Sequence, residues 1–266
     1  MANESTSNPN YTLYVYYTRY SSWGARVQLV LEHLQIPYEV QYFNLTNPSL
    51  SPPTDLTTLP VLDVISGDAE PLRIHDSLAI AEYLAEQFPS KRLWPSDSHL
   101  RALARVAAAT MHSSFAALRD AYPSNFVGHF SGPGIPFTEA VANDVAKLLE
   151  LWNRTRAAAK KRLAQIGQTD EDFLCGGFSI ADAFFWPVLW RLRSYNVPLT
   201  GISEDALKWI ETMWNDPVIK AQGREYFRQA QDPQTKVLLY DDVFKNSPDV
   251  TSREFTEGWV FEAASV

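Results

Sequence analysis

The chain has 266 residues, of which 45% are hydrophobic and 13% aromatic, so it can bury the core of one large domain or of two ordinary ones. Its 31 acidic and 23 basic residues give a net charge of −8, which offers no electrostatic reason to expect nucleic acid or an anionic membrane as a partner. It has no long apolar run and no signal or transit peptide pattern, and its single cysteine, Cys175, excludes an internal disulfide and a cysteine-rich metal site. These features predict a cytoplasmic protein without a metal centre.

Strand and helix patterns alternate along the first part of the chain. Residues 1–10 are polar and predict a disordered leader. Residues 11–17 are β-branched and aromatic and predict a strand, residues 26–35 place apolar side chains on one helical face, and residues 38–45 predict a second strand. This order is a βαβ unit, in which a right-handed crossover joins two parallel strands.

A second group of elements follows a loop rich in Pro, Ser and Thr, which has room for at most a short helical turn. Residues 59–64 and 72–74 predict an antiparallel hairpin. The capping side chains of Asp76 and Ser77 then begin a helix that runs to about Phe88. The first part of the chain therefore has the order βαβ, loop, ββα.

The remainder of the chain predicts helices and no strands. Helical spacing of apolar residues predicts helices at about residues 100–122, 137–166, 180–195, 203–215 and 218–229. A break rich in Gly and Pro covers Gly128–Pro136. The resulting division is a leader at 1–10, a mixed domain at 11–90, a linker at 91–98, an all-helical domain at 99–230 and an irregular C-terminal tail at 231–266.

The first candidate site is Tyr20-Ser21-Ser22-Trp23, at a junction between strand and helix. A serine there can simply cap the helix. The same geometry also stabilises an anion such as a thiolate, because a helix N-terminus presents unpaired N–H groups, and a hydroxyl bonded to the sulfur favours its charged form. No cysteine lies at this junction, which disfavours disulfide-exchange chemistry.

Two further motifs are expected at the same edge of the sheet. Leu59-Pro60-Val61 contains a proline that is either an edge stop or a cis turn, and a cis turn would leave the backbone of Val61 to pair with a peptide-like ligand. Asp76 and Ser77 either only cap their helix or hold the ammonium and the carboxylate of a γ-glutamyl group. The concurrence of the three motifs favours binding over capping alone.

A fourth motif, from Phe178 to Asp182, has a structural interpretation. Ser179 and Asp182 satisfy the serine-x-x-acid pattern of a capping box, with aspartate in place of glutamate. We therefore expect it to begin a helix and not to take part in catalysis.

Together these motifs resemble the cytosolic glutathione S-transferase superfamily over about residues 11–228. The resemblance rests on the serine motif, Leu59-Pro60-Val61, His75–Leu84, Leu93-Trp94-Pro95 and Phe178–Asp182. It implies an α/β plus all-α protein, with a thioredoxin-like N-terminal domain followed by a helical-bundle C-terminal domain. The serine motif and Met111–Arg119 are similar to a serine-type group common in bacteria and fungi. The serine pair followed by Arg26-Val27 is similar to the zeta class, which includes maleylacetoacetate isomerases, although Trp23 replaces the cysteine of that class.

The resemblance also implies glutathione as the cofactor and assigns residues to it. Ser21 matches the hydroxyl that activates the thiol, with Ser22 as the alternative, and Val61 matches the backbone partner of the cysteinyl part. The implied glutathione-binding residues are Ser21, Trp23, Leu59, Pro60, Val61, Asp76 and Ser77. The family usually has Lys, Gln or Asn shortly before the proline to hold the glycyl carboxylate, whereas this chain has only the hydroxyls of Asp55-Leu-Thr-Thr58.

The predicted substrate pocket lies along the helix that contains His112. A histidine on a mostly apolar helix can be a packing residue, but imidazole also moves protons near neutral pH. The predicted pocket residues are Tyr20, Met111, His112, Phe115, Arg119, Tyr122 and Asn125. Their polar groups would orient an oxygenated substrate.

Three functions are compatible with these residues. The first is a transferase, in which the glutathione thiolate attacks a small hydrophobic electrophile. The second is a glutathione-dependent cis–trans isomerase, of aromatic catabolism or of polyene tailoring in secondary metabolism. The third is a non-catalytic binding module, because fold alone does not fix function. The resemblance implies a homodimer, and the tail is expected to dock over the helical domain or the site through Leu238-Leu-Tyr240 and Trp259-Val-Phe261.

Overall fold

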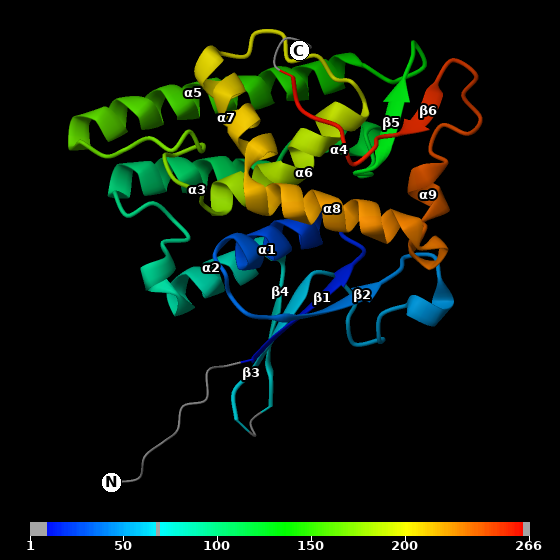
Figure 1. The fold of residues 1–266 in the computed structure, drawn as a ribbon, viewed down its shortest axis with the longest axis horizontal. Coiled ribbons are helices and arrows are strands. Elements are labelled where there is room, and N and C mark those ends of the chain that lie inside the picture. Colours follow the sequence, from blue (N-terminus) through cyan, green and yellow to red (C-terminus); the bar gives the residue numbers. More distant parts are fainter. Residues whose placement is uncertain (1–9, 68–69, 263–266) are drawn as a thin grey trace.

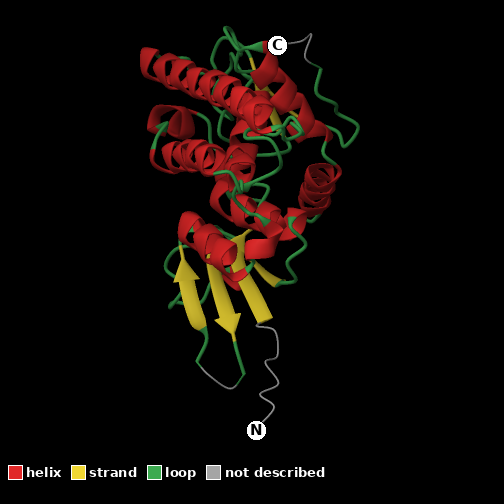
Figure 2. Ribbon diagram, turned by 90° about the vertical axis from the view of Figure 1, so that its left-hand side faces the viewer, coloured by secondary structure: helices red, strands yellow, loops and turns green. Residues whose placement is uncertain are grey.

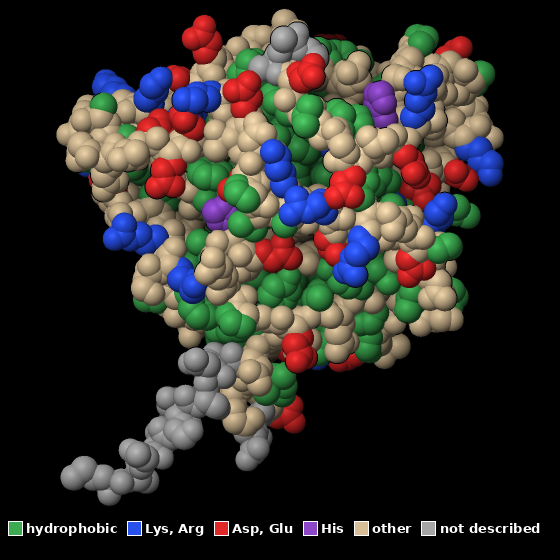
Figure 3. Space-filling model, in the orientation of Figure 1, with side chains coloured by type: hydrophobic (Ala, Val, Ile, Leu, Met, Phe, Trp, Pro, Cys, Tyr) green, Lys and Arg blue, Asp and Glu red, His purple; other side chains and the backbone are tan. Residues whose placement is uncertain are grey.

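The computed structural model describes residues 10–67 and 70–262 (Figure 1). The predicted leader at residues 1–10 lies outside the described residues, apart from Asn10, which begins the first strand. Acidic and basic side chains are interspersed on the face shown in Figure 3. Within the described ranges, no helix is both long and apolar enough to cross a membrane.

A four-stranded sheet forms the N-terminal part. Its strands are β1 (Asn10–Tyr16), β2 (Glu39–Phe43), β3 (Val61–Ile65) and β4 (Leu72–His75), in the order β2-β1-β3-β4. β1 and β2 are parallel, whereas β3 is antiparallel to both β1 and β4. The predicted βαβ, loop, ββα order and the thioredoxin-like fold are confirmed.

Two helices connect this sheet to the rest of the molecule. α1 (Ser22–His33) and α2 (Ser77–Gln87) lie on the side of the sheet that faces the helical part (Figure 2). α1 contacts both the sheet and two later helices, α6 and α8. The predicted loop contains one short 3₁₀ turn, η1 (Pro48–Leu50), and another, η2 (Pro89–Lys91), follows α2. The N-terminus of α1 therefore lies where the two parts of the chain meet.

The second part is a helical bundle. Its helices are α3 (Ser98–Ser113), α4 (Ala116–Ala121), α5 (Glu139–Ile166), α6 (Ile180–Ser194), α7 (Glu204–Asn215) and α8 (Pro217–Gln231). α6 is buried along nearly its whole length and packs against α1 and α3. The predicted single helix at 100–122 is wrong, because Phe115 takes a left-handed conformation with φ of 61° and separates α3 from α4. The ring of Phe115 is buried in the core, and this burial holds the break.

A small second sheet contradicts the expectation of no strands after residue 99. β5 (Gly128–Ser131) pairs antiparallel with β6 (Thr251–Glu254). The C-terminal tail is therefore not irregular, and it also contains η3 (Pro233–Thr235) and a short helix, α9 (Leu238–Asp241). Each strand has four residues, which is too short for a clear alternation, and each depends on a partner that is remote in sequence.

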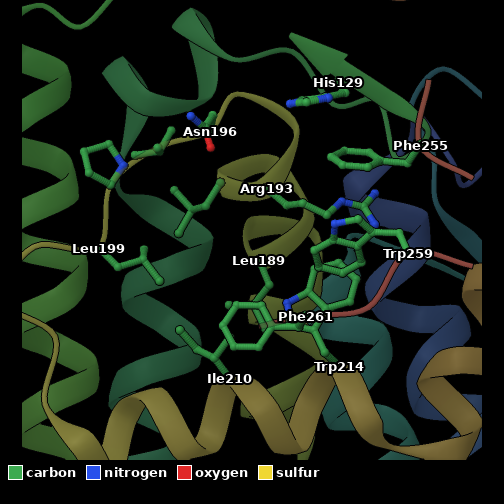
Figure 4. A pocket seen from close by; sticks show the side chains of 13 residues that line it. His129, Leu189, Arg193, Asn196, Leu199, Ile210, Trp214, Phe255, Trp259 and Phe261 are labelled. Atoms are coloured by element: carbon green, nitrogen blue, oxygen red, sulfur yellow. The ribbon is translucent and has the colours of Figure 1, made fainter. Parts of the chain in front are cut away.

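The end of the tail packs on the helical part, as one of the predicted alternatives has it. The guanidinium carbon of Arg193, from α6, lies 4.2 Å from the ring centre of Phe255 and 4.8 Å from that of Trp259. A pocket of about 410 Å³ opens beside these rings (Figure 4). Arg193 also donates a hydrogen bond to the carbonyl of Phe126. Cation–π contacts thus fix the last described segment to α6.

The predicted capping box begins α6. The buried carboxylate of Asp182 accepts hydrogen bonds from the Ser179 N–H at 2.8 Å, the Leu174 N–H at 2.9 Å and the Trp209 indole N–H at 2.9 Å. Because it joins a loop, a helix start and α7, Asp182 has the structural role that the sequence predicts.

Candidate functional site

A cavity of about 550 Å³ lies between the edge of the sheet and the helical part. Its lining residues come from the ends of β1 and β2, the start of α1, α4 and the loop after it, α6 and the tail. They are Tyr16, Tyr17, Tyr20, Ser21, Ser22, Trp23, Phe43, Leu45, Leu59, Arg119, Asp120, Pro123, Ser124, Arg191, Val237 and Tyr240. The parallel pairing of β1 and β2, with Tyr16 opposite Phe43, places both strand ends at one edge, where ligands of α/β sheets commonly bind.

Ser21 is the N-cap of α1. Its Oγ accepts a hydrogen bond from the Gly24 N–H at 3.3 Å, so the hydroxyl hydrogen is left to donate to a ligand. Ser22 is the first residue of the helix and is 8% exposed. Both serines and Trp23 line the cavity. The cavity therefore has serine hydroxyls beside the N-terminus of α1, the combination that the serine motif predicts.

The Leu59-Pro60 peptide bond is cis. Val61 is fully buried, and in the sheet register it lies between Tyr14 and His75. Leu59 lines the cavity, whereas Val61 does not. The structure thus brings the residue before the proline, rather than the residue after it, to the cavity.

Asp76 and Ser77 lie at the start of α2. Asp76 has φ of 75° and accepts hydrogen bonds from the N–H groups of Leu78 at 2.8 Å and Ala79 at 3.1 Å. Ser77 is fully buried, and its Oγ has no hydrogen-bond partner among the described residues. A buried hydroxyl without a partner is costly, so it is available to a polar group bound at this helix start.

His112 reaches across to Asp76 and not into the cavity. Its Nε2 lies 3.3 Å from an oxygen of Asp76, and its ring contacts Trp23 edge-on with centres 5.3 Å apart. Burial lowers the pKa of His112, Asp76 opposes this effect, and Arg26 and Arg119 reinforce it. The neutral imidazole is therefore favoured near pH 7, and the contact links α3 to α2.

The other predicted pocket residues divide into two groups. Tyr20 and Arg119 line the cavity. Met111 and Phe115 belong to the core, and the buried Tyr122 donates to the carbonyl of Pro136 at 2.8 Å. Asn125 is buried too, and its amide donates hydrogen bonds to the tail, as described below. Helical spacing predicted one continuous helix, but the backbone turns at Phe115, so that α4 lines the cavity through Arg119 whereas Met111 of α3 lies in the core.

The tail supplies a wall of the cavity through Val237 and Tyr240, whose ring stacks on Tyr20 with centres 5.6 Å apart. The Tyr20 hydroxyl donates to both carboxylate oxygens of Asp241, at 2.7 and 2.8 Å. Asn125 donates to Asp241 at 3.0 Å. Burial, the hydrogen bond and the charge of Asp241 raise the pKa of Tyr20, so its hydroxyl stays protonated and keeps donating.

Replacing Asp241 by alanine should loosen this wall. The substitution removes the acceptor of the Tyr20 hydroxyl and one of the two acceptors of the Asn125 amide, which also donates to the carbonyl of Tyr240 at 3.3 Å. We therefore expect the free energy of unfolding to fall by about 1–3 kcal/mol and proteolysis of the tail to accelerate. The matched control is Asp242→Ala, because Asp242 is exposed and pairs only with Lys245 in the part of the chain described. Denaturant titration of both variants measures the difference, and equal stabilities would rule out Asp241 as the anchor.

Arg191 and Val237 are among the cavity residues that the sequence did not indicate. Arg191 follows the apolar run Phe184–Trp190 on α6, and a charged residue within such a run was the available signal. Its Nε donates to the carbonyl of Tyr122 at 2.5 Å, and its Nη2 donates to the hydroxyl of Ser124 at 2.7 Å. Tyr240 belongs to Leu238-Leu-Tyr240, which was expected to dock over the helical domain or the site, whereas no local pattern indicated Val237.

The fold and the cavity define a thioredoxin-like domain joined to a helical domain with a site between them. The family profile "Glutathione S-transferase, N-terminal domain" matches residues 20–87, and "Glutathione S-transferase, C-terminal domain" matches residues 97–211. The chain therefore belongs to the cytosolic glutathione S-transferase superfamily.

Relatives in the superfamily have different functions. Pyrimidodiazepine synthase of Drosophila melanogaster is 27% identical over 237 residues, which cover 85% of this chain and 86% of that protein. Maleylacetoacetate isomerase of Aspergillus fumigatus is 36% identical over 110 residues, which cover 39% and 47%. The structure of a glutathione transferase homolog from Burkholderia with bound glutathione has a TM-score of 0.55 at 23% identity, and the match covers 84% of this chain and 99% of that one. This structural likeness concerns the fold alone.

Proposed function

We propose that the protein is a glutathione S-transferase that activates the glutathione thiol with a serine hydroxyl. The observation that carries the proposal is Ser21, which caps α1, lines the cavity and has a hydroxyl hydrogen free to donate. The single cysteine, Cys175, is buried in the helical part, and burial raises the pKa of its thiol. A protein thiolate is therefore not the nucleophile that the site favours.

The residues at the start of α2 fit a γ-glutamyl group. Asp76 would hold the ammonium, and the Ser77 hydroxyl, which has no partner among the described residues, would hold the carboxylate. The backbone next to Pro60 would align the peptide as an added strand. When bound, glutathione supplies the sulfur nucleophile. Ser21 would donate its hydrogen bond to that sulfur and so lower the pKa of the thiol, aided by the N-terminus of α1.

Calorimetric titration with millimolar glutathione tests the binding step. Ser77→Ala should weaken glutathione binding about tenfold, because one hydrogen bond to a charged group is lost. The control Ser49→Ala changes an exposed serine of η1 and should bind as the unchanged protein does. Absence of any heat signal with the unchanged protein would overturn the proposed function.

A glutathione-dependent isomerase is the second candidate. The serine pair of the zeta class and the partial similarity to maleylacetoacetate isomerase favour it. Product analysis with a conjugated cis substrate separates the two candidates: a stable conjugate supports transfer, whereas a trans product with unconsumed glutathione supports isomerisation. By the same family resemblance we propose a cytoplasmic homodimer, and gel filtration with light scattering tests its size.

A further inference from the structure

Two arginines line the cavity and a third lies behind it, and none of the three forms an ion pair with a carboxylate among the described residues. Arg119, on α4, and Arg191, on α6, line the cavity. Arg26 lies behind Trp23, with its guanidinium carbon 4.5 Å from the centre of the indole, and Arg119 lies 5.3 Å from the same ring. Among the described residues, no acidic side chain comes within 4.0 Å of any of these three guanidinium groups.

Each arginine also keeps a buried N–H group without a partner. Arg191 is 4% exposed and uses Nε and Nη2 for the loop after α4, but its Nη1 has no acceptor. Nη1 of Arg119 and both Nε and Nη1 of Arg26 lack acceptors too, among the residues described. Leaving charged donors unsatisfied is costly, so the site is built to receive an acceptor from outside the chain.

The electrostatics of the cluster agree with this interpretation. Burial, with a further contribution from the charges of Arg191 and Arg119, lowers the pKa of Arg26 to about 9, and the charge of Asp76 opposes this effect only in part. Burial lowers the pKa of Arg191 to about 10, and Arg119 adds to the effect. Asp120 lines the cavity, but no ion pair within the described part of the chain joins it to these arginines. A bound anion would relieve the mutual repulsion of the three cations.

The opposite part of the lining is aromatic. Tyr16, Tyr17 and Phe43 come from the ends of β1 and β2, and Tyr240 comes from the tail. The sheet side thus offers flat apolar faces, while the helical side offers cations. Asp76 and Ser77, the groups proposed for the γ-glutamyl part, do not line this cavity, so the cations remain for the second substrate.

We propose that the acceptor substrate is a flat, conjugated or aromatic carboxylate, whose carboxylate binds between Arg119 and Arg191 while its unsaturated carbon faces Ser21. Planar guanidinium groups match a carboxylate with paired hydrogen bonds. The reaction with this substrate depends on the proposed transferase function, whereas binding of the carboxylate to the arginines does not. In the test reaction, sulfur forms a bond to the ring carbon, chloride leaves with the bonding pair, and the thiol proton goes to solvent.

A matched pair of electrophiles tests the proposal: a chlorodinitrobenzoate and the corresponding uncharged carboxamide. We expect kcat/KM to favour the benzoate over the carboxamide by about tenfold or more, after correction for the uncatalysed rates. Arg119→Met should lower kcat/KM for the benzoate about 10- to 100-fold, leave the carboxamide nearly unchanged and leave glutathione affinity unchanged. Arg119→Lys should restore part of the preference, since it restores the charge without the paired donors. Arg119 is substituted rather than Arg191, because Arg191 also donates hydrogen bonds to the carbonyl of Tyr122 and the hydroxyl of Ser124 and therefore helps to hold the loop after α4.

The control variant is Arg154→Met, which removes the same charge from the exposed face of α5. It should keep the benzoate preference, which separates local binding from long-range attraction. An absent preference in the unchanged protein, an equal loss for both electrophiles in Arg119→Met, or weaker glutathione binding in that variant would each overturn the proposal.

Direct binding separates this proposal from the proposed function. A dinitrobenzoate without chlorine cannot react, and its quenching of tryptophan fluorescence reports binding in the absence of glutathione. Arg119-dependent binding in a protein that does not bind glutathione would support the anion site and reject the transferase. Glutathione binding without any benzoate binding would reject the anion site alone.

Discussion

Asp182→Ala is expected to lower the free energy of unfolding by about 3 kcal/mol or more. The substitution leaves the N–H groups of Ser179, Leu174 and the Trp209 indole buried without an acceptor, and each such group costs about 1–3 kcal/mol. Urea denaturation followed by far-UV circular dichroism measures the loss. Asp182→Asn keeps one acceptor oxygen and should lose less.

A suitable control for that experiment is Asp205→Ala, which makes the same change in the first turn of α7. Asp205 is partly exposed and pairs with Lys160 at the surface, and such pairs contribute about 1 kcal/mol or less. Equal losses for the two alanine variants would mean that the buried hydrogen bonds of Asp182 do not hold α6 in place.

Ser21→Ala is expected to reduce kcat/KM with glutathione about 100-fold, the usual effect of removing one donor to a developing anion. Because the hydroxyl would stabilise the thiolate, its loss should also move the rising limb of the pH–rate profile to higher pH. Calorimetry should show nearly unchanged affinity for glutathione, since the other contacts remain.

Two controls separate activation of the thiol from helix capping. Ser21→Thr keeps both the hydroxyl and the cap and should retain much of the activity. Ser22→Ala changes the neighbouring residue inside the helix and should have little effect on rate. If Ser22→Ala produced the loss and the shift in the pH profile instead, Ser22 would be the activating residue.

Much of the fold followed from local patterns. Strand and helix periodicity predicted the four-stranded sheet and most helices, because each pattern arises within one element. The break at Phe115 was not predictable in this way, since a left-handed phenylalanine depends on the packing of its ring. The β5–β6 pair joins segments that are far apart in the chain, and neither strand carries a strong signal by itself.

The candidate site shows the same difference between residues in local motifs and residues brought in by tertiary packing. Ser21 and Leu59 were predicted because motifs at element ends follow from topology, and both line the cavity. Arg191 and Tyr240 reach it only after α6 is buried and the tail has crossed the domain junction. The sequence therefore indicated Ser21, Leu59, Tyr20 and Arg119, whereas Arg191 became evident as a cavity residue only in the folded structure.

The contacts of the tail also affect when the site is completed during synthesis. Asn44, at the end of β2, donates to the carbonyl of Gln234 at 2.8 Å and to that of Lys236 at 3.1 Å. Domains fold in order from the N-terminus while the ribosome adds residues. The sheet, α1 and the bundle can therefore assemble before the segment that contains Tyr240 has emerged, and until then the cavity stands open on that side. A nascent chain would thus have Ser21, Arg119 and Arg191 in place before the Tyr240 wall of the cavity is added.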